Sequence, residues 1–330
     1  ENCIVGPDCR VSLSEPEMLG QPHSEYGLLI GMGGSDRCYY RDWKNGRSIV
    51  RMVCKPGDVD YGRHIDYSHF FTKFGIPVPE LLAWDAPAKQ AEFEDLGDLS
   101  LYNWHWYPRT QEQIEAVYKQ LLDVLATLHT HATESVQECV LLQQRIFDYD
   151  YFRWETSYFL ERFAVGLCSV TPCAPDELEK EFDQLARSAD ALPKAIIHRD
   201  CQSQNIMLKN GKPRIIDFQG ARMAPPAYDI ASILWDPYLR LDDALRARLL
   251  DHYREAVASR GVQRKDVLEG LLLCRLQRHM QALGAYGFLS TQRGKPYFRK
   301  HIPEGLRLLR EDLEESNGIY PALEKLAGAF

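Results

Sequence analysis

The sequence predicts an α+β protein with two lobes, in which a small antiparallel sheet precedes a larger and mainly helical part. Short strand-like segments separated by glycine-bearing turns fill the first part of the chain, and long segments with apolar residues at helical spacing fill most of the rest. A short hairpin with acidic and amide side chains interrupts the helical part between residues 195 and 220. With 330 residues and 45% hydrophobic composition, the chain can bury a sizeable core.

The composition excludes several classes of protein. The formal charge is −8 at pH 7 and Lys and Arg form no cluster, so a nucleic-acid-binding surface is not expected. No apolar window reaches the roughly eighteen residues of a membrane span, and the first residues lack a signal-peptide pattern. The nine cysteines are scattered without a CxxC pair, which argues against a zinc site or a disulfide framework. We therefore expect a cytoplasmic protein that binds neither nucleic acid nor membranes.

The first lobe is expected to span residues 1–96. Segments rich in β-branched and aromatic residues predict its strands, and helical spacing over 61–74 predicts its one helix. A glycine cluster between the first two strands contains Gly33, Gly34 and Ser35, whose backbone N–H groups can bind phosphate because glycine permits close approach and positive φ. A plain tight hairpin is the alternative interpretation. Strands are predicted at 26–30, 37–41, 48–53, 80–84 and 90–93.

Residues 97–330 are expected to form the second lobe, because apolar residues recur there at helical spacing. The stretch 147–163 is denser in aromatic residues than one buried helix face needs. Core packing is the favoured interpretation of these rings, and stacking on a substrate ring is the alternative. Helices are predicted at 111–131, 149–165, 175–191, 228–235, 241–259, 265–286 and 303–315.

The hairpin carries the candidate catalytic residues. Asp200 follows the short apolar run 195–197, and Asn205 stands five residues later. An Asn-Gly pair supplies a two-residue turn, and the returning strand ends at Asp217. Pairing of the two strands places the Asn205 amide and the Asp217 carboxylate at the same end, as an all-oxygen ligand set of the kind that Mg²⁺ takes beside phosphate. An Asp, an Asn after four further residues and a later Asp also occur in this order in kinases.

This spacing predicts phosphoryl transfer from ATP with Mg²⁺, and it gives two residues of the first lobe a candidate role in nucleotide binding. Arg51 lies in the third strand, where a kinase usually places the lysine that binds the α- and β-phosphates, and Lys55 is the alternative. Arginine can bind phosphate through two N–H groups, although a solvated arginine fits the pattern equally well. Glu94 begins an acidic, glycine-bearing break, 94–98, which predicts the hinge between the lobes and a backbone contact to adenine.

Two other classes of protein are less compatible with these residues. A eukaryotic protein kinase has glycine where Gln219 stands and a long activation segment before its next helix, and the sequence has neither. A nucleotide-binding module without activity would be expected to lack one of Asp200, Asn205 and Asp217, and all three are present. The residues therefore predict a phosphotransferase that is not a eukaryotic protein kinase.

Two stretches, HRDCQSQNIM and IIDFQGARMAPPAYDIASILWDPY, resemble the bacterial aminoglycoside phosphotransferase and choline kinase superfamily. Its members are small-molecule kinases with a protein-kinase-like two-lobe fold. Within the superfamily the sequence is most similar to the N-acetylmuramate/N-acetylglucosamine anomeric kinases of cell-wall recycling. The similarity includes the Asp-Phe-Gln tripeptide, the Pro-x-x-Tyr-Asp pattern and a final helical stretch that begins at Leu283.

The resemblance implies that ATP phosphorylates the anomeric hydroxyl of an N-acetylated amino sugar. Asp200 would be the catalytic base, Asn205 and Asp217 the Mg²⁺ ligands, and His198 and Asp229 structural supports of the catalytic loop, Asp229 by bracing its backbone. An aminoglycoside or another small alcohol is the alternative acceptor. The mixed Arg, Lys and Glu of the C-terminal helices favour a neutral or anionic sugar. The candidate sugar contacts are Gln202, Arg153, Glu155, Trp235 and Asp236.

Overall fold

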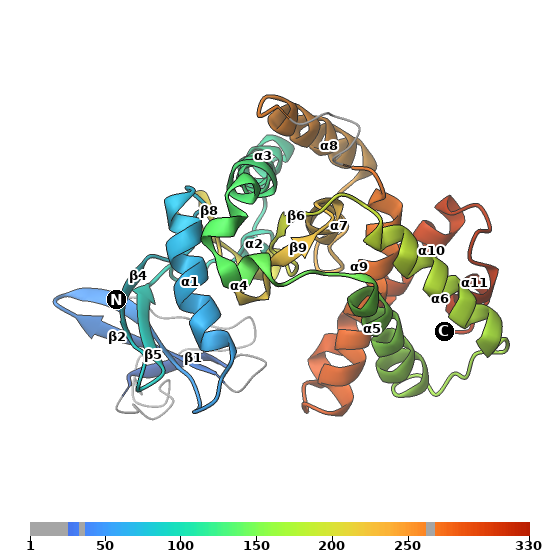
Figure 1. The fold of residues 1–330 in the computed structure, drawn as a ribbon, viewed down its shortest axis with the longest axis horizontal. Coiled ribbons are helices and arrows are strands. Elements are labelled where there is room, and N and C mark those ends of the chain that lie inside the picture. The colour runs from blue at the N-terminus through green and yellow to red at the C-terminus, as the bar shows by residue number, and fades with distance from the viewer. Residues whose placement is uncertain (1–25, 33–36, 262–267) are drawn as a thin grey trace.

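The computed structural model describes residues 26–32, 37–261 and 268–330 (Figure 1). The first part of the chain forms the predicted antiparallel sheet, with strand order β1-β2-β3-β5-β4. The predicted helix α1 (Asp60–Lys73) packs beside this sheet. Gly33, Gly34 and Ser35, the predicted phosphate contacts, lie outside the described residues. The strands are β1 (Leu28–Met32), β2 (Cys38–Lys44), β3 (Arg47–Val53), β4 (Leu81–Asp85) and β5 (Gln90–Glu94).

The two faces of the sheet have different neighbours. Met52 pairs with Tyr39 on β2 and Ala91 on β5, and it belongs to a buried cluster with Tyr61 of α1. Because successive side chains of a strand point to opposite faces, Arg51 lies on the face away from α1. We refer to these as the inner face, which packs on α1, and the outer face, which carries Arg51.

The remainder of the chain is mainly helical, as predicted. Two of the long helices, α3 and α5, continue into π-helical turns at 128–132 and 160–165. None of the helices in the described part of the chain is both long and apolar enough to cross a membrane. The helices are α2 (Leu101–Trp104), α3 (Gln111–Thr127), α4 (Val140–Gln143), α5 (Tyr149–Phe159), α6 (Pro175–Asp190), α7 (Ala227–Leu234), α8 (Asp243–Ala258), α9 (Leu271–Thr291), α10 (Ile302–Glu315) and α11 (Pro321–Ala327).

Helix α9 is the central element of this helical part. It packs against α5, α7 and α10, and most of its side chains are buried (Figure 1). Gly287 permits the close approach to the π-helical turn after α5, since an added Cβ would overlap the carbonyl of Arg162. The polar residues of α9 are therefore enclosed by protein, which requires partners for them inside the molecule.

Four short strands lie between α6 and α7. Strand β6 (Ala195–Ile197) pairs with β9 (Arg222–Ala224), and β7 (Ile206–Lys209) pairs with β8 (Lys212–Ile215). Phe218 connects this region to the sheet lobe, because its ring meets Phe71 of α1 edge to face at 5.9 Å between ring centroids. The backbone N–H of Leu208 donates to the carbonyl of Leu99 at 2.7 Å, so β7 runs beside the segment that follows the sheet.

Candidate active site

The hairpin of β7 and β8 has the predicted register. Ile206 pairs with Ile215, and the turn residues Asn210 and Gly211 have φ of 52° and 74°. Positive φ at both positions is what a type I′ hairpin turn requires, and Asn-Gly is the dipeptide that adopts it most readily. The backbone N–H of Ile216 donates to the carbonyl of Asn205 at 3.0 Å. Asn205 and Asp217 thus come together at one end of the hairpin, as the sequence indicated.

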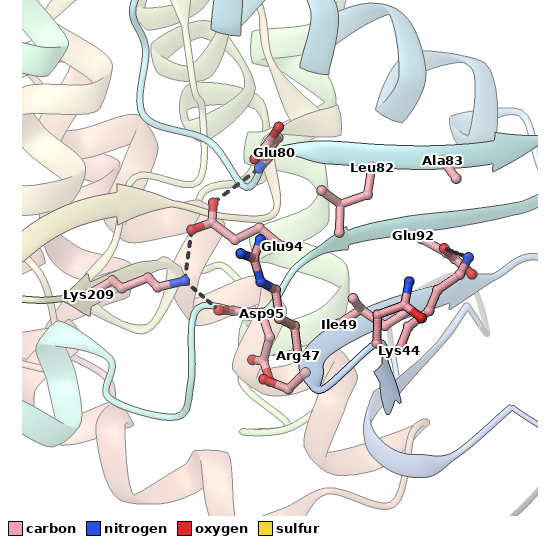
Figure 2. A pocket seen from close by; sticks show the side chains of 12 residues that line it. Lys44, Arg47, Ile49, Glu80, Leu82, Ala83, Glu92, Glu94, Asp95 and Lys209 are labelled. Atoms are coloured by element: carbon pink, nitrogen blue, oxygen red, sulfur yellow. Dashed lines mark hydrogen bonds and ion pairs between the residues drawn. The ribbon is translucent and has the colours of Figure 1, made fainter.

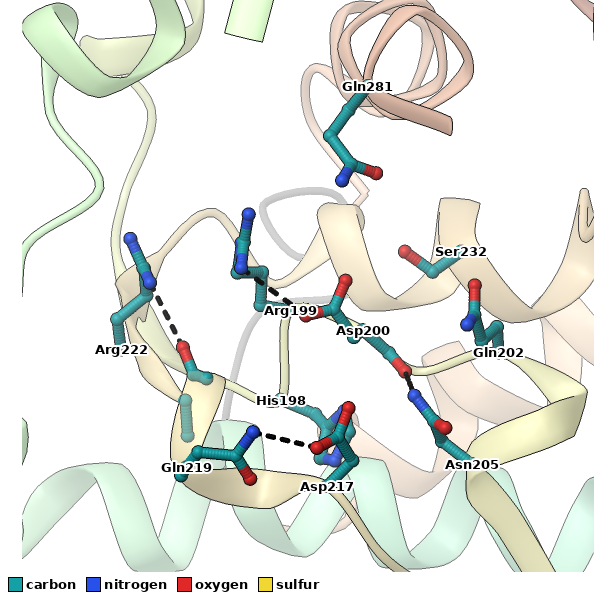
Figure 3. A network of polar contacts seen from close by, with 12 residues as sticks. His198, Arg199, Asp200, Gln202, Asn205, Asp217, Gln219, Arg222, Ser232 and Gln281 are labelled. Carbon is teal, nitrogen blue, oxygen red and sulfur yellow. Dashed lines mark hydrogen bonds and ion pairs between the residues drawn. The ribbon is translucent and has the colours of Figure 1, made fainter. Parts of the chain in front are cut away.

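The oxygen atoms of these two side chains fit a divalent cation. The Asn205 Nδ2 donates to the backbone carbonyl of Asp200 at 2.9 Å, and no described residue donates to its Oδ1. Asp217 has φ of 62°, and its Oδ1 accepts from Gln219 Nε2 at 2.7 Å (Figure 3). Among the described residues none donates to Asp217 Oδ2. The site therefore offers an amide oxygen and a carboxylate, hard ligands that suit Mg²⁺ when phosphate oxygens complete the shell.

Asp200 lies beside these ligands with a quarter of its side chain exposed. Burial alone would raise the pKa of Asp200, but the positive charges of Arg199 and Arg278 hold it below its ordinary value. The Arg199 Nη1 lies 3.4 Å from Asp200 Oδ2. Figure 3 shows Arg199 on one side of Asp200 and Gln202 on the other, with Gln281 reaching toward it from α9. Asp200 is therefore ionised at neutral pH and can accept a proton from a hydroxyl.

A buried carboxylate on α7 braces the start of the catalytic loop. Asp229 accepts the backbone N–H groups of His198 at 2.6 Å and Arg199 at 2.9 Å. His129 Nε2, from the π-helical turn after α3, lies 3.2 Å from the same carboxylate. His198 in turn donates from Nε2 to the carbonyl of Ile216 at 3.0 Å. These contacts fix the backbone on both sides of the loop that carries Asp200.

A second buried carboxylate braces the far end of the loop. Asp236 accepts the backbone N–H of Ser203 at 2.8 Å and that of Tyr238 at 3.0 Å. Its carboxylate is fully enclosed, and burial raises its pKa. Asp236, a predicted sugar contact, instead supports the loop backbone through these two hydrogen bonds.

A cavity of about 150 Å³ opens beside Asp200. One part of its wall is polar, and another part consists of aromatic rings and small apolar side chains from α9 and the segment after it. This combination is typical of pockets for small polar ligands. Gln202 lies in the cavity wall, as predicted. The lining comprises Asp200, Gln202, Gln204, Tyr238, Arg278, Gln281, Ala282, Ala285, Tyr286, Leu289 and Phe298.

Sequence reasoning missed the part of this wall that α9 supplies. The available signal was the polar composition of α9, where Arg278 and Gln281 interrupt a helix whose other residues are largely apolar. A buried helix with such residues needs internal partners or a ligand. The pattern does not reveal which of these applies, because the neighbours of α9 come from distant parts of the chain.

Three predicted sugar contacts lie elsewhere. Arg153 donates to Thr156 Oγ1 of its own helix, α5, and pairs with Glu179 of α6. The guanidinium groups of Arg275 and Arg246 lie over the indole ring of Trp235, at 4.5 and 5.0 Å from its centroid. Glu155 is fully buried and accepts the hydroxyl of Tyr228 at 2.9 Å. None of the three belongs to the wall of the cavity beside Asp200.

The outer face of the sheet carries a separate hollow of about 900 Å³ (Figure 2). It includes Glu94, whose carboxylate binds Lys209 at 2.8 Å and Arg214 at 2.5 Å and so joins β5 to the β7–β8 hairpin. Arg51, on the same face, pairs with Asp42 and Glu92 at 3.1 and 3.2 Å. The catalytic-loop residues do not line this hollow. Arg51 therefore lies on the face of the sheet away from α1, and its contact with phosphate stays a prediction.

Comparison with known proteins agrees with this geometry. Residues 28–264 match the family described as "Phosphotransferase enzyme family". The chain is 26% identical to an N-acetylmuramate/N-acetylglucosamine kinase of Neisseria meningitidis serogroup B, over 93% of this chain and 92% of that protein. It is also 26% identical to the protein of the same name from Pseudomonas aeruginosa, over 99% and 97% of the two chains.

Two solved structures illustrate the fold that the chain shares. A choline/ethanolamine kinase family protein from Mesorhizobium loti superposes with a TM-score of 0.60 at 14% identity, covering 95% of this chain and 97% of that one. The ADP-bound aminoglycoside phosphotransferase APH(2'')-Ib superposes with a TM-score of 0.54 at 13% identity, covering 86% and 93%. The protein thus has the kinase-like fold that the sequence predicts. It belongs to the phosphotransferase enzyme family and is a kinase whose acceptor is an alcohol group.

Proposed function

We propose that the protein is an ATP- and Mg²⁺-dependent sugar kinase that phosphorylates the anomeric hydroxyl of an N-acetylated amino sugar, N-acetylmuramate or N-acetylglucosamine. The observation that carries the proposal is the position of Asp200. Its ionised carboxylate lies in the wall of a small cavity and also beside the oxygen atoms of Asn205 and Asp217. The names of two relatives that align over nearly the whole chain supply the sugar.

In the proposed reaction, Asp200 accepts a hydrogen bond from the acceptor hydroxyl and directs its oxygen toward the γ-phosphorus of ATP. The new bond joins that oxygen to phosphorus, the bond to the leaving ADP oxygen breaks, and the hydroxyl proton passes to Asp200. Asn205 and Asp217 would hold Mg²⁺, which neutralises charge on the transferring phosphates. The braced backbone of the loop keeps these three side chains in one arrangement, as positional catalysis requires.

An anomeric acceptor suits this site. The anomeric hydroxyl of a reducing sugar is more acidic than an ordinary alcohol, so it needs little help from a base. Phosphoryl transfer also passes through a loose transition state in most analyses, in which positioning contributes more than proton removal. A partly exposed Asp200 with a lowered pKa is a weak base but a good hydrogen-bond acceptor.

The principal alternative is an aminoglycoside acceptor, because aminoglycoside phosphotransferases share the fold. A polycationic acceptor requires several carboxylates in the pocket. The described cavity wall contains one carboxylate, Asp200, and one guanidinium, Arg278. This balance of charge favours a neutral or anionic sugar.

We also propose that the chain divides into lobes at residues 96 and 97, with the hinge at 94–98, and that ATP binds between them. The support is the contact between Leu208 on β7 and Leu99, which places the catalytic hairpin directly beside the segment that leaves the sheet. A kinase that draws on ATP is consistent with the cytoplasmic location that the sequence predicts.

The acceptor hydroxyl is tested with matched sugars. N-acetylglucosamine and N-acetylmuramate are expected to support ADP release, whereas 1-O-methyl N-acetylglucosaminide, which retains the other ring hydroxyls, is not. Phosphorus NMR of the product is expected to show an acid-labile phosphate coupled to the C1 proton. Turnover of the methyl glycoside would show that another hydroxyl is the acceptor, and preference for an aminoglycoside would favour the alternative.

A further inference from the structure

We propose that Arg278 forms an anion subsite within the cavity beside Asp200, and that this subsite binds a carboxylate of the acceptor sugar. The enzyme would therefore prefer an acidic N-acetylated sugar to its neutral counterpart. This inference rests on the proposed function, because it concerns the acceptor pocket of the same reaction.

The first observation is a buried charge without an ion-pair contact among the described residues. Arg278 is 3% exposed, and no described carboxylate forms an ion pair with it. Its Nε donates to Ser232 Oγ at 3.1 Å, its Nη2 to Gln202 Oε1 at 2.7 Å and its Nη1 to Gln281 Oε1. All three acceptors are neutral. A buried cation normally has a charged partner, because its desolvation is costly.

Arg275, one helical turn earlier on α9, is a buried arginine whose charge is neutralised by carboxylates. It is buried to a similar degree, and its guanidinium pairs with both Asp312 and Glu315 of α10. The two arginines differ in what lies before them. Arg275 faces carboxylates of a neighbouring helix, and Arg278 faces the cavity.

The hydrogen-bond inventory of Arg278 also leaves room for a ligand. A guanidinium has five N–H groups. Three of them are used by the neutral oxygens of Ser232, Gln202 and Gln281, so two have no acceptor among the described residues. A carboxylate has the geometry to accept two parallel N–H groups from one arginine, and such charge-assisted pairs are the stronger hydrogen bonds of proteins.

The positions of Arg278 and Asp200 in one cavity would orient the acceptor sugar. Arg278 and Asp200 line the same small space, so they attract and repel a carboxylate respectively. An acceptor that carries a carboxylate would place that group at Arg278 and leave its hydroxyl for Asp200. The rings of Tyr238, Tyr286 and Phe298 offer apolar surface for the rest of the sugar.

Compensation of Asp200 does not account for the position of Arg278. Asp200 already has Arg199 within ion-pair distance, at 3.4 Å. Asp200 thus has an ion-pair partner closer than Arg278, and no described carboxylate forms an ion pair with Arg278. Of the two sugars in the names of the relatives, N-acetylmuramate differs from N-acetylglucosamine by an ether substituent that bears a carboxylate, which is the group that Arg278 would bind.

The test compares two sugars and one ester in steady-state kinetics. For the wild type, KM is expected to be lower for N-acetylmuramate than for its uncharged methyl ester or for N-acetylglucosamine. Arg278→Gln is expected to raise KM for N-acetylmuramate, relative to KM for N-acetylglucosamine, by roughly 10- to 100-fold, the range of a charge-assisted hydrogen bond. Arg278→Lys keeps the positive charge but not the parallel N–H groups of the guanidinium. Its KM for N-acetylmuramate should lie between those of the wild type and Arg278→Gln. Arg187→Gln, which removes an exposed arginine of α6, is the matched control.

The ratio of KM for N-acetylmuramate to KM for N-acetylglucosamine distinguishes loss of carboxylate binding from general disruption of the site. A general loss of positioning at Asp200 would affect both sugars alike. An equal loss for both sugars in Arg278→Gln would overturn the subsite. The ester comparison uses only the wild-type enzyme, so it decides the matter even where the variant does not fold, and equal KM for acid and ester would also overturn it. An enzyme that phosphorylates both sugars without discrimination refutes the subsite alone. One that phosphorylates neither sugar refutes the proposed function as well.

Discussion

Arg41 on β2 and Asp95, just after β5, form a two-point ion pair, with Nε–Oδ2 at 2.6 Å and Nη2–Oδ1 at 3.0 Å. Asp98 joins the same guanidinium at 3.1 Å. Arg41 pairs with Val50 across the sheet, which places it on the inner face with Met52. The inner face of the sheet is thus tied to the segment that leads into the helical part. This tie holds the two parts of the proposed nucleotide site in one geometry.

Replacing Arg41 by Met is expected to lower the free energy of unfolding by about 3 to 5 kcal/mol at neutral pH, the usual cost of leaving a buried charge unpaired. Asp95 is the charge left unpaired, since its side chain is only 6% exposed. Urea denaturation at pH 7 measures the change. Lys44→Met removes an exposed lysine that pairs with Glu92 and should change stability by less than about 1 kcal/mol.

The pH dependence of this pair has a defined sign. Burial alone would raise the pKa of Asp95, but Arg41 and the backbone N–H of Gly97 hold it below its ordinary value. The stabilisation is therefore complete above the ordinary pKa of an aspartate, about 4, and is lost as pH falls through the lower pKa of the folded state. The difference between wild type and Arg41→Met should shrink below about pH 4. A difference that grows on acidification would contradict this account.

Asp200→Asn is expected to lower kcat by roughly 10² to 10⁴ while leaving the fold and ATP binding unchanged, because the amide cannot take the hydroxyl proton. A reaction that needs Asp200 chiefly for orientation would lose activity at the low end of that range. Single-turnover kinetics and nucleotide titration measure the two quantities separately. A variant within threefold of the wild type would remove Asp200 from the mechanism.

Nucleotide affinity is expected to depend on Mg²⁺ through Asp217. Asp217→Ala removes the one carboxylate of the proposed ligand pair, so titration with a non-hydrolysable ATP analogue should show a large Mg²⁺ effect in the wild type and little in the variant. Asp251→Ala, at an exposed position of α8, is the control and should bind as the wild type does. Equal affinity with and without Mg²⁺ in the wild type would refute the metal site.

Glu155 is expected to make stability fall as pH rises toward neutrality. Burial raises the pKa of Glu155 to about 7, in spite of the nearby positive charges and the Tyr228 hydroxyl. Between the ordinary pKa of 4.5 and 7 the unfolded chain has lost a proton that the folded protein retains, so stability declines across that window. At about 1.4 kcal/mol for each pKa unit, the decline attributable to Glu155 is roughly 3 kcal/mol.

The measurement compares the wild type with Glu155→Gln by chemical denaturation at several pH values. Any fixed cost of the glutamine amide is the same at each pH, so the informative quantity is the change in the difference between the two proteins. The free energy of unfolding of the variant should rise relative to that of the wild type from about pH 4.5 to 7. The difference should then stay constant above about pH 7. Glu177→Gln, an exposed residue of α6, should show no such trend. A difference that does not vary with pH would mean that Glu155 is ionised in the folded protein.

The sequence by itself determined the elements and the catalytic hairpin. Strand and helix periods are local properties, and they predicted the five-stranded sheet, α1 and most later helices. Asp200, Asn205 and Asp217 could be placed together because an Asn-Gly turn specifies the pairing of the strands on either side of it. The short helices α2, α4 and α11 were not predicted, because a segment of one or two turns is too short to show a helical period of apolar residues.

Only the tertiary structure decided which way the other candidate side chains face. Periodicity shows which residues share a face of a helix, but not which part of the molecule that face meets. Arg153 and Arg278 are both helical arginines in sequence, yet one packs toward α6 and the other enters the cavity beside Asp200. Alternation along β3 likewise shows that Arg51 and Met52 lie on opposite faces of the sheet, but not which face packs on α1. The buried cluster of Met52 with Tyr61 of α1 decides this. The contact of Gln202 with Arg278 joins residues far apart in the chain, and such contacts depend on how the whole core packs.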